Sequence, residues 1–529
     1  MQQELRLSTS AAVAANEQLL KEEIADALSL SPEKKFFFRL LKRSVDARGR
    51  SIKINLTLKI FIDEIPEEED FSMFYKDVEG KQSAVIIGAG PAGLFAALRF
   101  LESGIKPIII ERGKTVKDRR RDLAAINKDH IVNPESNYCF GEGGAGTYSD
   151  GKLYTRSNKR GDINRILRIF IFHGASSEIM VDAHPHIGTN KLPGIIEKMR
   201  ETILKHGGEI LFEHKLTDLE IENKEISVIE ILDLKNGETK KISTKNLILA
   251  TGHSARDIYE LLQKKNIFIE AKPFAMGVRI EHPQEIIDSA QYHCRTKEET
   301  EKIRELLPAS SYSMVHQVKG KGVYSFCMCP GGIIAPCATA QQEVVTNGWS
   351  PSKRNNPYAN SGIVVGLDLN DFKKFEKEKA LSGLRFQQEL EKNAWINGGK
   401  TQTAPAQRLV DFVNKKHSNS LPDCSYLPGI TSVQLQNVLG DLIADSLREG
   451  LKEFGKKMRG YYTNEAVLVG VESRTSTPVR IPRDAETCEH VEIKGLYPCG
   501  EGAGYAGGIV SAAMDGERVA EKIIQKNLF

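Results

Sequence analysis

Apolar residues recur at every second position along residues 52–62. This period of two predicts a half-buried β-strand, and residues 36–45 are expected to form its partner strand. Apolar residues spaced as on a helix predict a helix over residues 16–28. An acidic segment containing a proline follows at residues 64–70, and we interpret it as a solvated linker. The pattern therefore predicts a small N-terminal domain of helix and strands over residues 1–80.

The pattern then changes to short, continuous apolar runs. Residues 84–87 and 108–110 are such runs, which are typical of strands buried on both faces of a parallel sheet. Between them, Gly88, Gly90 and Gly93 have the G-x-G-x-x-G spacing. In this motif the glycines allow a tight turn, a close approach to a pyrophosphate and close packing of helix on strand. The unit predicts a dinucleotide site, with a purely structural glycine turn as the alternative.

An acidic residue completes this unit. Glu111 ends the second apolar run and follows Gly93 by 18 residues (111 − 93). An acid about 20 residues past the glycines typically hydrogen-bonds a ribose hydroxyl. A second glycine-rich entry to a helix, at residues 495–509, again directs free N–H groups toward an anion. The unit around Glu111 alone does not separate NAD from FAD.

A loop over residues 138–152 carries four closely spaced glycines, namely Gly141, Gly143, Gly144 and Gly146. That many glycines are unfavourable in the interior of a helix or a strand. They suit a loop laid flat against a planar ligand, and the alternative is a flexible surface loop. Because the loop follows a nucleotide-binding unit, we favour the ligand.

Three further parts follow the N-terminal domain. Residues 81–272 hold the dinucleotide unit, a helix over residues 190–206, alternating strands and a buried strand that ends in Ala-Thr-Gly. Residues 273–466 mix strand-like runs with long helical patterns, which predicts an inserted α+β substrate domain. Residues 467–529 return to the first part. The expected fold is α/β, with a Rossmann-type domain built on a parallel sheet.

Composition narrows the class of protein. The chain has 529 residues, of which 40% are hydrophobic and 27% charged, so several globular domains are expected. A net charge of +3 gives no electrostatic case for nucleic acid or an anionic membrane. No apolar run approaches the ~20 residues of a membrane span, and the N-terminal residues lack a signal-peptide core. Eight scattered cysteines fit a reducing compartment, so a cytoplasmic protein is expected.

The order of these motifs resembles the glutathione-reductase-like flavoprotein superfamily. The strings at residues 140–153, 272–283, 326–332 and 500–509 resemble those of a bacterial family of FAD-dependent dehydrogenases of uncharacterised substrate. The likeness spans most of the chain, including the N-terminal domain. It implies noncovalent FAD binding and oxidoreductase chemistry, because the first and last segments would build one site.

The resemblance also implies which residues contact FAD. The glycine turn would hold the diphosphate, Glu111 the adenosine ribose, and Glu501 the ribityl chain and phosphate. The segment around Lys152 would lie near the flavin ring. The full implied set is Gly88, Gly90, Pro91, Ala92, Gly93, Glu111, Arg112, Gly143, Gly144, Ser149, Asp150, Gly151, Lys152, Leu216, Ala250, Thr251, Gly252, Gly500, Glu501, Gly508 and Ile509.

No catalytic residue follows from the sequence. Disulfide reductases of the superfamily use C-x-x-x-x-C beside the flavin, but Gly144 stands where a partner of Cys139 would be. Cys327 and Cys329 form C-x-C, for which we favour buried core cysteines over a redox pair or a thiolate near the flavin. Metal binding is not expected, because His184 and His186 lack further ligands at a useful spacing.

Several charged residues in and after the insert have two interpretations, surface ion pairs or an arginine that binds a substrate carboxylate. We favour surface ion pairs for this set, which comprises Arg279, Glu281, His282, Arg474 and Arg480.

The electron donor is also left open. No second dinucleotide unit appears after residue 112, so NADH or NADPH would have to dock transiently, or the substrate itself would donate. We expect an enzyme that acts on a small organic molecule. The alternatives are a flavin-dependent tRNA-modifying enzyme, which near-neutral charge disfavours, and a non-catalytic flavin-binding scaffold.

Overall fold

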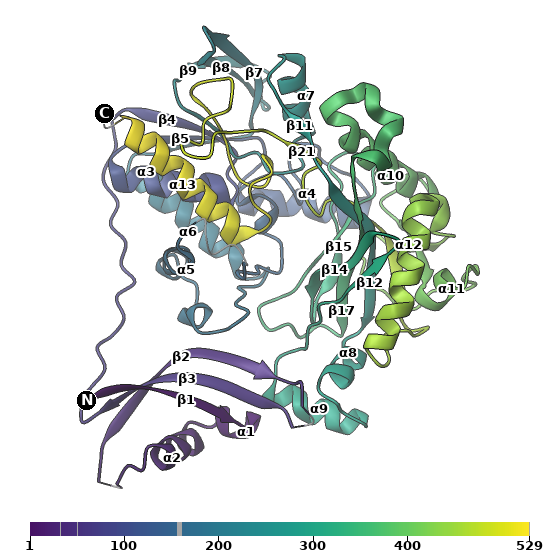
Figure 1. Ribbon diagram of the computed structural model, residues 1–529. Helices are drawn as coiled ribbons and strands as arrows, with labels where there is room; N and C mark the ends of the chain where they lie inside the picture. Colours follow the sequence, from purple (N-terminus) through teal and green to yellow (C-terminus); the bar gives the residue numbers. More distant parts are fainter. Residues whose placement is uncertain (32, 50, 156–160, 528–529) are drawn as a thin grey trace.

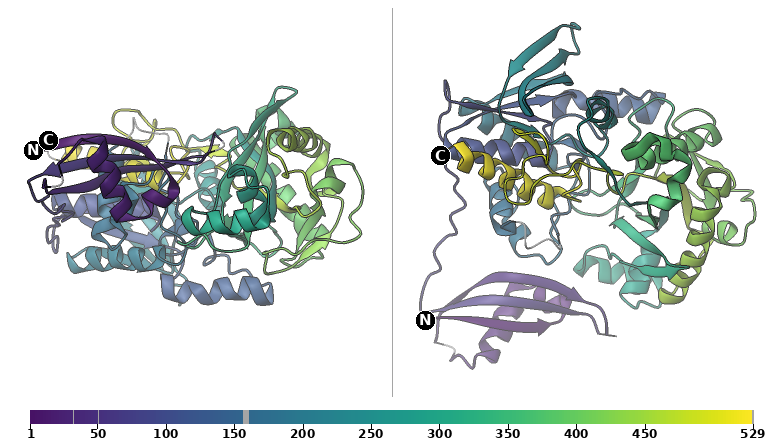
Figure 2. Two further views of the ribbon diagram at one scale, coloured as in Figure 1. Left: turned by 90° about the horizontal axis from the view of Figure 1, so that it is seen from below. Right: turned by 45° about the horizontal axis from the view of Figure 1, so that its top comes forward.

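The computed structural model describes residues 1–31, 33–49, 51–155 and 161–527. A small N-terminal domain lies below two larger bodies, one built on a parallel sheet and one on a seven-stranded sheet (Figure 1). A view from another side shows the N-terminal domain joined to the rest by a single extended segment (Figure 2). Within the described residues, no helix is both long and apolar enough to cross a membrane.

The N-terminal domain is an antiparallel sheet in the order β1-β3-β2, packed on two helices. The predicted strands are present as β2 (Phe36–Asp46) and β3 (Lys53–Ile62), and the predicted helix as α2 (Glu17–Ala27). Asn16 caps α2, because its side chain accepts the N–H groups of the second and third helical residues. The strand β1 (Gln2–Thr9) was not predicted from the sequence, and α1 (Ala11–Ala14) is a single turn.

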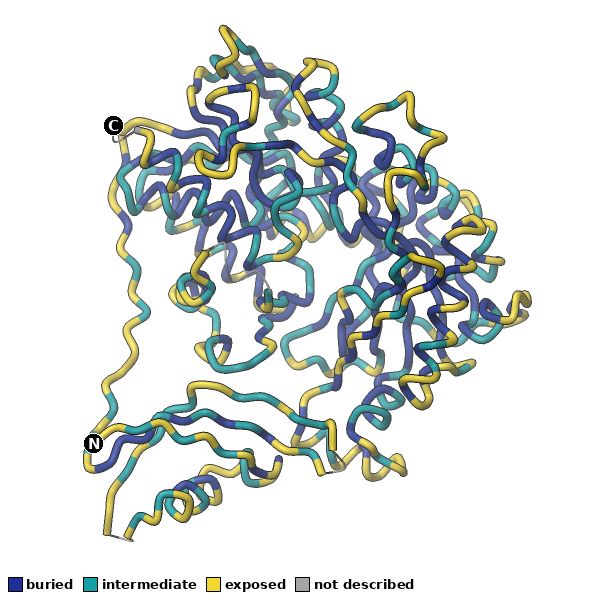
Figure 3. The backbone as a smooth tube through the Cα atoms, in the orientation of Figure 1, coloured by how far each residue is buried: buried dark blue, intermediate teal, exposed yellow. Residues whose placement is uncertain are grey.

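The segment at residues 65–80 begins exposed to solvent and then contributes buried side chains to the next domain. Residues 65–70 are largely exposed, as the yellow stretch of the tube shows (Figure 3). Tyr75 and Val78 are buried in the core of the parallel-sheet body, and the Val78 N–H donates to the His206 carbonyl oxygen at 2.9 Å. Tyr75 and Val78, which precede the expected boundary at residue 80, thus pack on the next domain.

The parallel sheet has the strand order β22-β10-β4-β5-β6. Every neighbouring pair is parallel. The strands are β4 (Ser83–Ile87), β5 (Lys106–Glu111), β6 (Glu209–Phe212), β10 (Leu247–Leu249) and β22 (Leu496–Pro498). Both predicted apolar runs are thus adjacent central strands, as the dinucleotide unit requires.

Both faces of this sheet are covered. Ile86 points into a core with four helices, whereas Val85 and Ile87 point into a core on the other face. The helices are α3 (Pro91–Ser103), α5 (Ile163–Phe172), α6 (Leu192–Lys205) and α13 (Ile509–Asn527). The other face carries α7 (Arg256–Lys264) and an antiparallel sheet of β7 (His214–Glu222), β8 (Glu225–Asp233) and β9 (Thr239–Ser243). Burial on both faces explains the continuous apolar runs, and the α/β prediction is confirmed.

The inserted body is a mixed sheet in the order β13-β14-β17-β12-β20-β18-β19. Its strands are β13 (Val315–Val318), β14 (Lys321–Cys329), β17 (Tyr358–Leu367), β12 (Phe274–Pro283), β20 (Val467–Glu472), β18 (Ala404–Arg408) and β19 (Ile430–Ser432). Two long helices, α10 (Ser382–Asn397) and α12 (Gln436–Lys457), pack on one face of it. Because β20 pairs with β12 and β18, this sheet extends past residue 466, where we expected the insert to end.

The opposite face of the same sheet turns toward the parallel-sheet body. Along β12, Met276, Val278 and Ile280 enter the core beneath the helices. The alternate side chains of Arg279 and Glu281 are also buried, although they are charged. A short two-stranded sheet, β15 (Ile333–Pro336) with β16 (Thr346–Trp349), lies between the two bodies. The two sheets therefore enclose polar side chains between them.

Candidate functional site

A cavity of about 390 Å³ lies at the carboxyl ends of the parallel strands. Ligands of open α/β sheets bind at this edge. Its lining combines the ends of β4, β5, β10 and β22 with the loop at residues 139–152 and the start of α13. Among the residues implied to contact FAD, all but Gly93 and Gly143 line this cavity. The structure thus brings together segments that are far apart in the sequence.

The glycines of the first turn have different roles. Gly88 has a φ of +106°, and a Cβ there would lie 2.4 Å from the Ala250 carbonyl oxygen. A Cβ at Gly93 would lie 2.0 Å from the Gly88 carbonyl oxygen, so Gly93 serves close packing rather than lining the cavity. Gly90 is the N-cap of α3 and no side chain caps that helix. Its free N–H groups therefore face the cavity.

The cradle fits a dinucleotide. A Cβ at Gly90 would meet only Gly144, at 4.0 Å, and none of Gly252, Gly507 and Gly508 has a neighbour within 4 Å of such an atom. All of them line the cavity. The backbone is thus open to a ligand from the first turn, the Ala-Thr-Gly strand end and the C-terminal helix entry at once.

Glu111 ties three backbone segments together at the cavity wall. Its side chain is 5% exposed. One carboxylate oxygen accepts the Ala89 N–H at 2.8 Å, and the other accepts those of Gly113 and Gly141 at 2.8 and 3.0 Å. A carboxylate has about four acceptor sites, so roughly one remains for a ribose hydroxyl. Glu111 therefore shapes the cradle as well as lining it.

Arg112 forms the neighbouring wall. Its guanidinium binds Asp257 at 2.6 and 3.0 Å in a bidentate pair and contacts Glu135 at 2.8 Å. It also lies 4.5 Å from the centre of the Phe140 ring. Arg112 is therefore held rigidly between acids and an aromatic face.

The glycine-rich loop packs against the first turn. Gly143 has a φ of +76°, and a Cβ there would lie 2.0 Å from Thr147 Oγ1. A Cβ at Gly144 would lie 3.2 Å from the Cα atom of Gly90. Further along, Asp150 is nearly buried and forms an ion pair of 2.8 Å with Arg354. The loop is thus an ordered wall and not a flexible surface segment.

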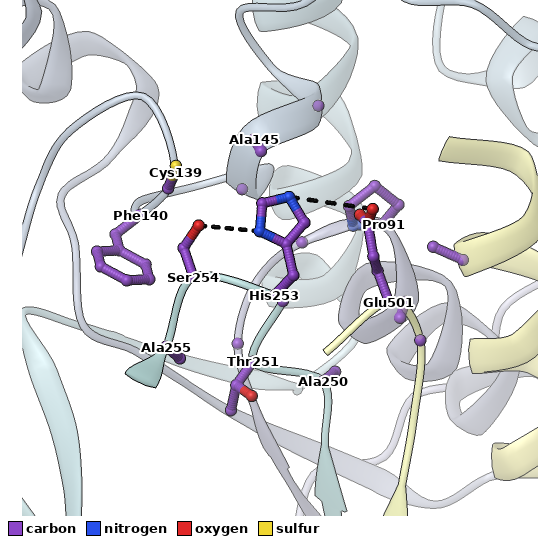
Figure 4. A pocket seen from close by; sticks show the side chains of 18 of the residues that line it. Pro91, Cys139, Phe140, Ala145, Ala250, Thr251, His253, Ser254, Ala255 and Glu501 are labelled. Atoms are coloured by element: carbon purple, nitrogen blue, oxygen red, sulfur yellow. Dashed lines mark hydrogen bonds and ion pairs between the residues drawn. The ribbon is translucent and has the colours of Figure 1, made fainter. Parts of the chain in front are cut away.

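His253, Ser254 and Glu501 meet over the cavity (Figure 4). His253 Nδ1 is 3.0 Å from Ser254 Oγ, and its Nε2 is 4.0 Å from Glu501 Oε1. Burial lowers the pKa of His253 to about 4 and raises that of Glu501 to about 7. Near neutral pH this histidine is therefore uncharged, and Glu501 titrates there.

The two cysteines of the C-x-C motif have different environments. Cys329 is buried, as predicted, whereas Cys327 is exposed and lines the cavity. The prediction of a core cysteine is therefore wrong for Cys327. The reason is a bulge in β14, because Phe326 pairs with Gly362 while Cys329 pairs with Asn360.

The charged residues of the insert are mostly buried and not on the surface, which contradicts the surface ion pairs that we favoured. Arg279 and His282 have no exposed surface, and Glu281 and Arg474 are 1% and 9% exposed. Arg474 binds the carboxylates of Glu343 and Glu391, each at 2.9 Å. Only Arg480 of the set is exposed. Other parts of the fold cover these charged residues, and a sequence pattern does not show such packing.

Further residues line the cavity beside the set implied to contact FAD. Most come from the insert or directly follow a selected segment, and they include Cys139, Phe140, His214, Lys215, His253, Ser254, Phe326, Cys327, Asn347, Arg474 and Thr475. His253 and Ser254 could have been found, since they directly follow Ala-Thr-Gly. Asn347 carries no sequence signal of its own.

Models of known families match three parts of the chain. Residues 82–274 match pyridine nucleotide-disulphide oxidoreductase, and residues 273–475 match FAD-dependent protein, C-terminal domain-like. Residues 1–61 match a domain of unknown function. The matches follow the three bodies of the fold, and the second extends past β20.

Solved structures with similar chains include a flavoprotein and a reductase-like protein. A flavoprotein/dehydrogenase from Cytophaga hutchinsonii is 12% identical, with 84% of this chain and 79% of that chain covered and a TM-score of 0.31. A geranylgeranyl bacteriochlorophyll reductase-like protein from Thermoplasma acidophilum is also 12% identical, with 84% and 80% covered and a TM-score of 0.35. At TM-scores this low, the similarities assign neither a reaction nor a substrate.

A relative by sequence covers nearly the whole chain. A protein of Clostridium beijerinckii named "Uncharacterized protein" is 39% identical over 533 residues, which is 96% of each chain. The relationship therefore includes the N-terminal domain and the insert. The chain belongs to the same family as this clostridial protein, a family of FAD-dependent oxidoreductases that joins a pyridine nucleotide-disulphide oxidoreductase domain to an FAD-dependent C-terminal domain-like region.

Proposed function

We propose that the protein is an FAD-dependent dehydrogenase or reductase that binds FAD noncovalently and acts on a small organic substrate. The carrying observation is the convergence of two glycine-rich helix entries, Gly90 at α3 and Gly508 at α13, on one cavity at the carboxyl edge of a parallel sheet. Two such entries supply free N–H groups and helix dipoles to one anionic ligand.

Each segment has a part in this proposal. The turn at Gly88 and Gly90 would hold the diphosphate, and Glu111 would receive the adenosine ribose at its remaining acceptor site. Leu216 of β7 and Thr251 flank the nucleotide half, and Glu501 lies along the ribityl chain. These assignments rest on the places of the residues in the cavity lining.

When bound, FAD supplies hydride and electron-transfer chemistry. The chain itself orients the cofactor and excludes water on the side of the insert. Phe326, Cys327 and Asn347 line the cavity from the insert, so a substrate would contact this side of it. Arg474, which also lines the cavity, is held in place by its buried ion pair with Glu391.

An anaerobic visible spectrum tests the proposal. Purified protein should show a flavin spectrum, and the flavin should stay with it on gel filtration. Denaturation should release the flavin, as expected for noncovalent FAD. Addition of NADH and then NADPH should bleach the spectrum if one of them docks as a transient donor. A spectrum that stays oxidised with both points to a substrate or a protein as the donor. Colourless protein that takes up no FAD would overturn the proposal.

A further inference from the structure

Two sulfur atoms converge on one ammonium group at the insert side of the cavity. Lys152 Nζ lies 3.7 Å from Cys327 Sγ and 3.9 Å from Cys329 Sγ. Lys152 comes from the glycine-rich loop, and both cysteines come from β14 of the insert. Lys152 and Cys327 line the cavity that holds the glycine turn. The contact therefore joins the two larger bodies of the fold.

The backbone around Cys327 is held in an unusual conformation. Cys327 has a φ of +46°, which a residue with a side chain rarely adopts. Arg279 Nη2 donates to the Cys327 carbonyl oxygen at 2.7 Å, and Lys152 Nζ donates to that of Met328. The buried Arg279 and the half-buried Lys152 thus fix the bulge that turns Cys327 into the cavity. Strain of this kind is concentrated at functional sites.

The surroundings favour a thiolate at Cys327. A hydrogen bond from the Cys329 thiol lowers the pKa of the Cys327 thiol well below its ordinary value. Burial opposes this shift, and the positive charges of Lys152 and Arg279 add to it. Arg279 Nη2 also lies 3.7 Å from Cys329 Sγ. A thiolate beside a neighbouring thiol is the arrangement from which a disulfide forms.

We propose that Cys327 and Cys329 are a redox-active pair that cycles between dithiol and disulfide and exchanges one electron pair with the flavin. The inference rests on the proposed FAD site. On oxidation the Cys327–Cys329 bond forms, the Cys329 proton leaves, and the oxidised flavin takes up the electron pair and that proton. In reverse, a reduced flavin gives back the pair, the S–S bond breaks, and the proton returns to Cys329.

This pair is distinct from the cysteine of the glycine-rich loop. The Cys139 sulfur lies 3.8 Å from the carbonyl oxygen of Cys337 and 3.9 Å from Arg474 Nη1, not beside the sulfurs of the C-x-C motif. A disulfide between Cys327 and Cys329, which only Met328 separates, would be strained. It would therefore be reduced more easily than an ordinary structural disulfide. Such a bridge suits a pair that must be reduced by a flavin.

Anaerobic reductive titration of the holoprotein tests the pair without turnover. Air-oxidised wild-type protein should take up one further electron pair per chain beyond the pair that its flavin accepts. The Cys327→Ser variant should take up only the flavin's pair, and Cys294→Ser, which changes a thiol remote from the cavity, should behave as wild type. Cys327 is exposed, so its replacement should leave the fold intact.

Thiol alkylation followed by mass analysis gives an independent readout. In air-oxidised protein the peptide with both cysteines should resist alkylation until a reductant is added. In reduced protein, Lys152→Gln should move the midpoint of the pH profile of Cys327 alkylation upward by about one unit, because it removes a neighbouring positive charge. A peptide that is fully alkylated in the air-oxidised holoprotein, with uptake of the flavin's pair alone, would overturn the proposal. That result would leave the FAD site standing, whereas absence of bound flavin would remove both.

Discussion

The Arg279 guanidinium donates to the Glu472 carboxylate at 2.9 Å, in an ion pair that is closed to solvent on both sides. The two residues lie on the neighbouring strands β12 and β20. Arg279 also donates to Asn360 Oδ1 at 2.8 Å and to the Cys327 carbonyl oxygen. One buried cation therefore supports the cavity wall and the bulge that carries Cys327.

Loss of this cation should destabilise the insert strongly. Arg279→Met would leave Glu472 buried without its partner, which costs about 3–5 kcal/mol in the free energy of unfolding. Burial already raises the pKa of Glu472 to about 7 against the pull of Arg279. The double variant Arg279→Met/Glu472→Gln should recover part of the loss, since it removes the unpaired charge. Urea unfolding of the single and double variants measures the coupling, and additive effects would contradict it.

Gly90 should be essential for FAD binding but not for folding. A Cβ at Gly90 projects into the open cradle, so Gly90→Ala should weaken FAD binding at least tenfold, or by about 1.4 kcal/mol. Its melting temperature without cofactor should stay close to that of the wild type. The matched control is Gly194→Ala in α6, where a Cβ meets nothing within 4 Å. Flavin retained on gel filtration reports the difference, and equal retention by both variants would refute the assignment of this turn.

FAD affinity should fall as the pH rises through neutrality. Burial, with a contribution from Cys327, raises the pKa of Glu501 from 4.5 to about 7. Below that pH the carboxyl is neutral and tolerates a nearby diphosphate, and above it the carboxylate repels the diphosphate. A titration of binding between pH 6 and pH 8.5 should show a loss in the wild type on the order of tenfold. Glu501→Gln should be flat over this range, and an equal slope in both proteins would exclude Glu501 as the cause.

Local sequence patterns predicted the glycine turn of the cavity better than the side formed by the insert. The apolar runs at β4 and β5 and the spacing of Gly88, Gly90 and Gly93 are short-range signals, so the strand, turn and helix followed directly from the sequence. Arg279 occupies an alternate polar position on β12, which normally faces solvent, but β16 covers it, since a Cβ at Gly348 would lie 2.4 Å from Arg279 Nη2. Cys327 points into the cavity because of a bulge in β14, and the spacing of apolar residues does not predict this bulge. Residues whose environment depends on two packed bodies were therefore the ones misassigned.

Two truncations should separate the N-terminal domain from the core that follows it. Removal of residues 1–70 takes away the three-stranded sheet and the exposed linker, and FAD binding should persist. Removal of residues 1–80 also deletes Tyr75 and Val78, whose side chains are buried under α5 and α6. At about 1.5–3 kcal/mol for each fully buried apolar side chain, the longer truncation should be less stable by roughly 3–6 kcal/mol.

The shorter truncation is the control for the longer one. Both uncover the same surface on α8 (Gln284–Gln291) and α9 (Lys297–Leu306), where Tyr292 and Leu307 pack against the N-terminal sheet. Any cost of that exposure is therefore common to both proteins, and the difference in melting temperature reports residues 71–80 alone. Equal melting temperatures would show that this segment adds nothing to the core. If the shorter truncation also loses FAD, the N-terminal domain supports the cofactor site. The contact of Arg43 with residues 181–183 would then carry that support.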